Sequence, residues 1–207
     1  VITSENGTKI LTDPYESGAY DGNIRYAPIK EKVDVVTVSH EHADHGHLKD
    51  LPGEPVILRG AGGYVASGIS FQGISAFHDK SHGAERGVSV IFTFIVDDIK
   101  VCHLGDLGHE LSSDQAAEAG AVDVLLTPVG GLFTIDAKEA WTVANQLASK
   151  IVIPMHFKTP KVGFPIAPVD EFIKDKPNVK RLGKSEVEIN KNTLPSEREI
   201  IVLEPAL

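Results

Sequence analysis

The segment from Ser39 to His45 concentrates side chains that can bind a metal, because it reads Ser-His-Glu-His-Ala-Asp-His. It follows the run from Val33 to Val38, which is rich in β-branched residues, nearly continuous in apolar character, and therefore predicts a buried strand. A cluster of imidazole rings is poor core material, since each neutral ring keeps a polar nitrogen that needs a partner. A divalent cation can take up several ring nitrogens at once. The segment therefore predicts a metal site at the end of this strand.

The spacing of these side chains predicts two neighbouring metal positions. On an extended backbone His40 and His42 point to one side, and Glu41 points to the other. Asp44 and His45 follow where the chain turns, so they can face a second point close by. The start His40-Glu41 resembles the helical zinc motif His-Glu-x-x-His, but an aspartate occupies position 44, which excludes that motif.

Three later segments also end an expected strand with a residue that can bind a metal. They deliver His78, Asp106 and His156 to loops, and scaffolds commonly build sites from such loops. His82 lies in the same loop as His78 and is an alternative ligand, although His78 follows the strand directly. His103 precedes Asp106 by three positions, and it could lie behind the site or pack as an ordinary core histidine.

The composition describes an ordinary globular chain. It has 207 residues, of which 42% are apolar and 24% are charged, so we expect one domain spanning residues 1–207 with a sizeable core. The formal charge of −9 disfavours a nucleic-acid or anionic membrane partner, which would need a basic surface. A small-molecule substrate, even an anionic one, stays compatible because metal ions supply local positive charge.

The cysteine content and hydropathy favour a cytoplasmic setting. Cys102 is the only cysteine, so an intrachain disulfide is excluded. No apolar run approaches the ~18 residues that span a bilayer, and no signal peptide is recognisable. The chain starts at Val1, so a natural N-terminal segment could be missing.

The order of expected elements indicates two packed β-sheets with helices outside. Short strands dominate the first half, and from residue 112 strands alternate with helices that begin at Ser112 and Asp136, each three residues before a Gln or Glu that completes a capping box. A third helix is expected at 169–174. We expect strands at 8–12, 33–38, 56–58, 69–72, 74–77, 88–96, 99–104, 122–127, 151–154, 185–189 and 199–204. The glycine cluster at 60–63 is interpreted as a turn, because its spacing does not match a dinucleotide-binding loop.

The pattern His40-x-His42-x-Asp44-His45 after a strand resembles the metallo-β-lactamase superfamily, and the resemblance extends from residue 8 to about residue 160. The segments 12–15, 103–108 and 128–131 look most like the prokaryotic metal-dependent hydrolases that include ascorbate-phosphate lactonase-like proteins. The resemblance implies an α+β fold, a four-layer αββα sandwich with two mixed β-sheets flanked by helices. Members usually begin with a further strand carrying a Gly-His pair, and nothing upstream of Ile2 provides it.

The resemblance also implies the metal ligands. One metal would be held by His40, His42 and His78. The other would be held by Asp44, His45 and His156. Asp106 would bridge the two metals, and Asp13 would accept hydrogen bonds behind them.

These ligands imply the chemistry of a hydrolase. Neutral histidines with carboxylates suit Zn²⁺ at two sites, and Mn²⁺, Fe or Ni²⁺ bind similar sites. A hydroxide shared by the two metals would be the nucleophile, Asp106 would hold the metals together, and Asp44 could pass a proton to the leaving group. We therefore expect a binuclear metal-dependent hydrolase that cleaves a small, anionic ester, lactone or phosphodiester.

Three other functions stay open at this point. A metal-dependent nuclease shares the signature, although the net charge disfavours it. An oxygen-reducing di-iron enzyme would usually carry Glu where His42 stands. A non-catalytic metal-binding protein could keep the same ligands. The substrate, the metal in the cell and the oligomeric state are not encoded in any motif that we recognise.

Overall fold

The computed structural model describes residues 1–207 as two β-sheets with a few short helices. The strands are β1 (Ile2–Thr3), β2 (Lys9–Thr12), β3 (Val35–Val38), β4 (Val56–Arg59), β5 (Gly62–Ala66), β6 (Ile69–Phe77), β7 (Val88–Val96), β8 (Ile99–His103), β9 (Val124–Pro128), β10 (Ile151–Met155), β11 (Val179–Arg181) and β12 (Glu199–Val202). The helices are α1 (Ala19–Gly22), α2 (Ser113–Ala119), α3 (Ala137–Gln146), α4 (Val169–Ile173) and a 3₁₀ turn at Lys191–Thr193.

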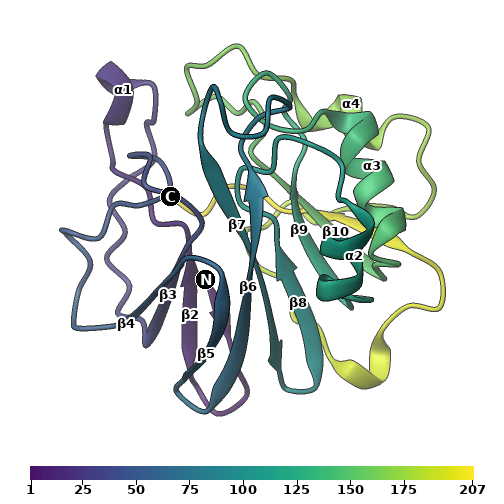
Figure 1. Ribbon diagram of the computed structural model, residues 1–207, viewed down its shortest axis with the longest axis horizontal. Coiled ribbons are helices and arrows are strands. Elements are labelled where there is room, and N and C mark those ends of the chain that lie inside the picture. The colour runs from purple at the N-terminus through teal and green to yellow at the C-terminus, as the bar shows by residue number, and fades with distance from the viewer.

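Both sheets are mixed. The smaller sheet has the order β1-β2-β3-β4, in which β1 is antiparallel to β2 and the other pairs are parallel. The larger sheet has the order β11-β12-β10-β9-β8-β7-β6-β5, with antiparallel pairs from β5 to β8 and parallel pairs from β8 to β11. Figure 1 shows α2, α3 and α4 gathered on the side of the molecule away from β2, β3 and β4. The predicted α+β sandwich of two mixed sheets is confirmed.

Alternation along the strands divides the apolar residues between two faces of the smaller sheet. Ile10 and Val35 face the larger sheet, where they join a core that includes Phe92 and Phe94. Their neighbours face outward into a separate small cluster, which loop residues such as Leu48 cover. Loops therefore cover this outer face, whereas helices cover the outer face of the larger sheet.

The helices cover the larger sheet through a core of small and aliphatic side chains. Ala140, Val143 and Ala144 of α3 are fully buried and lie at helical spacing. The capping boxes predicted at Ser112 and Asp136 are both present, so each helix begins where its first backbone N–H groups find acceptors.

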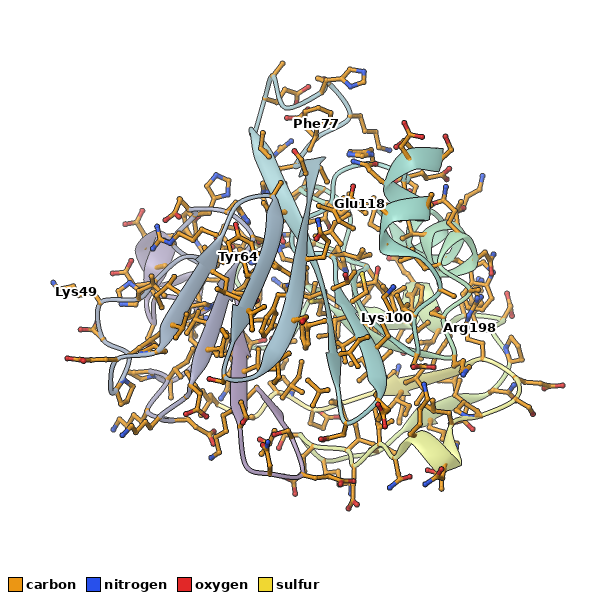
Figure 2. All side chains as sticks on the ribbon, turned by 60° about the horizontal axis from the view of Figure 1, so that its bottom comes forward. Lys49, Tyr64, Phe77, Lys100, Glu118 and Arg198 are labelled. Carbon is orange, nitrogen blue, oxygen red and sulfur yellow. The ribbon has the colours of Figure 1, made fainter.

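Parallel strands bring their carboxyl ends to one edge of a sheet, and this positions the site. The chain leaves β2 at Asp13 and β3 at Ser39 on the smaller sheet. On the larger sheet, β6 ends before His78, β8 ends at His103, and β10 ends before His156. Figure 2 shows Phe77 at the end of β6, at the edge from which the next loop projects.

Four details differ from the predicted elements. The strand predicted at 185–189 is wrong, because that segment forms no strand and the sheet is completed by β11 at 179–181 instead. The glycine cluster at 60–63 is only partly a turn, because β5 already begins at Gly62. The segments 69–72 and 74–77 form one strand, β6, which runs through Gly73. A short β1 pairs with β2 at the edge of the smaller sheet.

No helix in the structure is long and apolar enough to cross a membrane.

Candidate metal centre

Two groups of potential metal ligands lie next to each other at the converging strand ends. The first group consists of His40, His42 and His78, and its ligand atoms all lie within 4.8 Å of one another. The second consists of Asp44, His45 and His156, with ligand atoms within the same distance. These are the two sets that the resemblance implied, so the structure brings together residues from distant parts of the chain.

Asp106 lies between the two groups and is almost fully buried. Its Oδ2 atom is 3.3 Å from His78 Nε2 and 3.6 Å from His156 Nε2. Its Oδ1 atom is 3.2 Å from His45 Nε2 and has no hydrogen-bond partner. A carboxylate in this position can contact a cation in either group, and the unpartnered Oδ1 fits such a role.

A hydrogen-bond chain fixes the ring orientation of two of the histidines. The backbone N–H and the hydroxyl of Ser39 donate to Asp13 at 2.7 and 2.5 Å. Because the hydroxyl proton goes to Asp13, the Oγ atom is left to accept from His40 Nδ1 at 2.9 Å. Asp13 also accepts from His45 Nδ1 at 3.0 Å. Both rings thus carry a proton on Nδ1 and turn Nε2 toward the cluster, where a bound cation would take the place of any proton on Nε2.

The facing ring nitrogens also fit a cation. His40 Nε2 lies 2.9 Å from His42 Nδ1, so two nitrogens that could both act as acceptors point at the same region. Since His40 carries its proton on Nδ1, its Nε2 atom keeps a lone pair that can bind a cation or accept a hydrogen bond from His42. Imidazole nitrogens grouped in this way are the ligands that Zn²⁺ and related ions prefer.

The pKa values of His40 and His45 are shifted in opposite directions. Burial, with a smaller contribution from His45, lowers the pKa of His40 to about 4. Burial also opposes protonation of His45, but the carboxylates of Asp106, Asp13 and Asp44 outweigh it and raise the pKa of His45 to about 10. The site therefore concentrates carboxylate charge that favours a positive partner beside His45.

The pKa of Asp106 lies well below its ordinary value. Burial alone would raise it, but His156 and His45 are the largest of several histidine contributions that outweigh burial. This carboxyl group is thus held ionised, which is the form that binds a cation.

Unusual backbone conformations occur at two of the strand ends. Asp13 has φ 46° and His156 has φ 50°, both in the left-handed region that L residues rarely adopt. Each turns the chain sharply just after a strand and brings its side chain to the cluster. Strain of this kind persists where the surrounding structure enforces it, and it concentrates at functional sites.

Three glycines allow the loops to pack directly on residues of the cluster. A Cβ atom on Gly105 would lie 2.5 Å from Ser39 Cβ, and one on Gly108 would lie 2.4 Å from the carbonyl carbon of His78. A Cβ atom on Gly130 would lie 2.2 Å from the backbone oxygen of His156. Only glycine allows these approaches without displacing the backbone that carries the ligands.

Asp79 organises the loop that follows His78. Its carboxylate accepts hydrogen bonds from the backbone N–H groups of four residues in that loop, which are Ser81, Gly83, Glu85 and Arg86. Burial opposes ionisation, but these hydrogen bonds outweigh it and lower the pKa of Asp79 to about 2. The loop is thus held in one conformation directly beside a candidate ligand.

Other candidate residues lie outside the cluster. His82 is exposed and its ring packs against Phe77, so His78 and not His82 joins the ligand group. His109 Nε2 accepts from the backbone N–H of Phe77 at 3.1 Å and thereby supports the end of β6. His103 is buried behind the site, where its Nδ1 atom has no hydrogen-bond partner. Its role stays a prediction.

Two residues of the site were not anticipated. Ser39 carries no signal of its own, because a serine beside a histidine is common and Asp13 lies 26 positions away. Tyr20 donates a hydrogen bond from its hydroxyl to Asp44 Oδ1 at 3.0 Å. It does so from α1, where Tyr20 and Asp21 have left-handed dihedral angles that no sequence pattern announces.

A cavity of about 410 Å³ adjoins the second group of ligands. Asp44, His45 and His156 lie along its wall, and it extends between the segments 15–26 and 155–166. Residues 203–207 form a further part of the wall. The volume is in the range of small-molecule sites in proteins.

Comparison with known proteins identifies the family. The model of the β-lactamase superfamily domain matches residues 1–156. The chain belongs to the metallo-β-lactamase superfamily. This confirms the predicted superfamily, whereas the narrower likeness to ascorbate-phosphate lactonases stays a prediction.

This chain is similar to two archaeal relatives and to one protein of known crystal structure. UPF0173 metal-dependent hydrolases of Methanospirillum hungatei and Methanocaldococcus jannaschii are 31% and 30% identical, covering 72% and 80% of this chain and 75% and 84% of theirs. A Thermotoga maritima protein, assigned as a Zn-dependent hydrolase of the metallo-β-lactamase superfamily, shares 37% identity and a TM-score of 0.78 over 97% of this chain and 91% of that one.

Proposed function

We propose that this protein is a hydrolase that uses two divalent cations, with Zn²⁺ as the best fit to its ligands. The observation that carries the proposal is the position of Asp106 between two groups of three ligands, His40, His42 and His78 on one side and Asp44, His45 and His156 on the other. The relatives of this chain that are named metal-dependent hydrolases support the same reaction class.

The donor set fits the metals chemically. The six outer ligands are histidines and one carboxylate, and the unpartnered Oδ1 atom of Asp106 lies between them. When bound, the metal pair would lower the pKa of a water molecule and polarise the carbonyl or phosphoryl group of the substrate. Orienting the ligands and moving the proton are then left to the side chains around the metals.

The residues of the chain orient the ligands and handle the proton. Ser39 and Asp13 keep the Nε2 atoms of His40 and His45 directed at the cluster. Asp44 lines the cavity and is the candidate for carrying a proton to the leaving group. Tyr20 holds Asp44 by a hydrogen bond to Oδ1, which leaves Oδ2 directed toward His45 Nε2 at 3.6 Å.

The reaction is hydrolysis of a small ester, lactone or phosphodiester. The oxygen of water joins the carbonyl carbon or phosphorus, the bond to the leaving oxygen breaks, and the proton goes to that oxygen. We propose a small molecule over a nucleic acid, because the net charge of −9 opposes a phosphate backbone. An anionic group on the substrate would find its positive partner at the metals.

The substitution His42→Ala tests the proposal. We expect it to remove the first metal position and to lower kcat/KM for p-nitrophenyl acetate or bis-p-nitrophenyl phosphate at least about 100-fold in the presence of Zn²⁺. His82→Ala is the matched control, because that histidine is exposed and lies outside the ligand groups. Metal content by elemental analysis accompanies both assays. Equal turnover by wild type and His42→Ala would refute the proposal.

A further inference from the structure

The cavity beside the second ligand group has an apolar wall that the chemistry of the metals does not require. The side chains of Ile24, Val162, Phe164 and Ile166 line it together with the ring of Phe157. We refer to the space bounded by these five side chains as the apolar chamber. Ile24 and Val162 also form an isolated backbone bridge, so the segments 15–26 and 155–166 are joined across it.

The polar groups around the apolar chamber are already engaged within the protein. The Tyr26 hydroxyl pairs with Thr159 Oγ1 at 2.7 Å, and the Tyr15 hydroxyl donates to the Ala27 carbonyl at 2.6 Å. The nearby ammonium group of Lys158 donates to the Phe164 carbonyl at 2.6 Å and so supports the wall. Each of these groups thus has a partner within the protein, and the Tyr26–Thr159 pair keeps one hydroxyl proton that it could donate to a ligand.

The charges on the cavity wall disfavour an anionic occupant of the chamber. No lysine or arginine lines the cavity, whereas Asp13, Asp44 and Glu204 do. A negative charge placed in the chamber would lose its hydration and meet carboxylates instead of a cation. The ammonium groups of Lys158 and Lys161 contact wall residues but are bound to the carbonyls of Phe164 and Leu207, so the ligand groups are the main source of positive charge for a substrate.

The size of the cavity sets the scale of the occupant. A dry cavity of roughly 150 Å³ lined by aliphatic and aromatic residues is enough for benzene in another protein. The volume of about 410 Å³ here has room for a hydrocarbon chain of moderate length as well as the reacting group.

We propose that the apolar chamber receives an uncharged hydrocarbon portion of the substrate while the scissile group lies at His45 and His156. The preferred substrates are then esters or lactones with an acyl chain of about six carbons, and not acetyl esters or acids with a second charge at the far end. This inference rests on the proposed hydrolase function, which it makes more specific. It also limits the anionic character expected from the sequence to the part of the substrate that faces the metals.

Chain length tests the inference in the wild-type protein loaded with Zn²⁺. Burial of four additional methylene groups is expected to make kcat/KM for p-nitrophenyl hexanoate at least about tenfold larger than for p-nitrophenyl acetate. Calorimetry provides a readout without turnover. Hexanoate should bind at least about tenfold more tightly than acetate, and also more tightly than adipate, whose second carboxylate would enter the chamber.

A variant pair localises the effect to the chamber. Val162→Phe fills part of the cavity and is expected to bring the ratio of hexanoate to acetate, in kcat/KM and in affinity, close to one. Val65→Phe makes the same change on β5 at a residue that is 77% exposed and does not line the cavity, so it should keep the wild-type ratio. If Val162→Phe does not fold, the chain-length and adipate comparisons still decide the question.

The outcomes separate this inference from the proposed function. If both esters are hydrolysed with equal kcat/KM and the three acids bind equally, the chamber has no such role and the hydrolase function stands. If neither ester is hydrolysed but hexanoate binds at least tenfold more tightly than acetate, and Val162→Phe removes that difference, the chamber stands and the proposed ester hydrolysis is wrong.

Discussion

The hydroxyl of Ser39 donates to Asp13 at 2.5 Å while its oxygen lies 2.9 Å from His40 Nδ1. One serine thus links a carboxylate at the end of β2 to a candidate ligand at the end of β3. Since Asp13 also accepts from His45 at 3.0 Å, this small network sets the ring orientation of one histidine from each candidate ligand group.

Replacing Ser39 with alanine is expected to weaken metal binding without unfolding the protein. The variant loses the hydroxyl contacts to Asp13 and His40, and partners of this kind typically contribute 10- to 100-fold in affinity. Competition with a chromophoric chelator measures the Kd for Zn²⁺. Ser89→Ala is the control, because this serine is also buried but its hydroxyl has no hydrogen-bond partner. Equal Zn²⁺ affinities for Ser39→Ala and wild type would show that the network has no role in binding.

A methyl group at Gly108 should disturb the loop that carries His78. Its Cβ atom would lie 2.3 Å from the backbone nitrogen of Asp79, so the backbone must shift. We expect Gly108→Ala to lower the free energy of unfolding by about 2 kcal/mol or more, measured by urea denaturation. Gly63→Ala is the control, because its nearest neighbour would be 3.6 Å away. A loss of equal size in both variants would contradict this expectation.

The left-handed backbone at His156 predicts that a glycine at this position gives a more stable protein than an alanine. At most positions alanine is more favourable than glycine, but at φ 50° the Cβ atom adds strain that glycine avoids. We expect metal-free His156→Gly to be more stable toward urea than His156→Ala by about 1 kcal/mol. In α2 the order should be the usual one, with Ala117→Gly costing about 1 kcal/mol. An Ala variant more stable than the Gly variant at position 156 would argue against strain there.

Asp123 should contribute stability that is lost in acid. Burial opposes its ionisation. Hydrogen bonds from the side chains of Lys191 and Lys150 and from the backbone N–H of Lys100 outweigh burial and lower its pKa from 3.8 to about 2. A carboxyl group whose pKa is lower in the folded state stabilises that state at every pH above its pKa in the unfolded chain. This contribution disappears as the pH falls from about 4 to about 2.

The variant Asp123→Asn isolates this contribution. Because the side chains of Lys150 and Lys191 are 47% and 43% exposed, solvent screening reduces the effect to about 1 kcal/mol. Urea unfolding of the metal-free protein should show the difference between wild type and variant shrinking by this amount from pH 5 to pH 2. Asp98→Asn, at an exposed turn residue, should show no such change. A difference that is independent of pH would refute the assignment.

The sequence allows the main strands, the helices and the candidate ligands between His40 and His45 to be predicted, because these depend on local patterns. A β-branched run followed by imidazoles is visible at β3, and the capping boxes of α2 and α3 are complete within four residues. The grouping of His78, Asp106 and His156 needed a family pattern as well, since no local rule brings distant strand ends together.

Other features of the site could not be predicted for definite physical reasons. Aspartate adopts left-handed dihedral angles more often than most residues and tyrosine rarely does, but no local pattern marks Asp13 or Tyr20 as a position that adopts them. The apolar chamber is built from two loop segments whose relative position depends on contacts such as the bridge between Ile24 and Val162. The strand expected at 185–189 has an alternating pattern, but β12 pairs with β11 at 179–181 instead.

The candidate ligands are divided between the two sheets. His40, His42, Asp44 and His45 follow β3 of the smaller sheet, whereas His78, Asp106 and His156 follow strands of the larger one. Any ion bound by both sets would connect the two sheets at the end of the sandwich where the ligands lie. Chelation would then loosen the two halves at that end first, while the aromatic side chains between the sheets keep the other end closed.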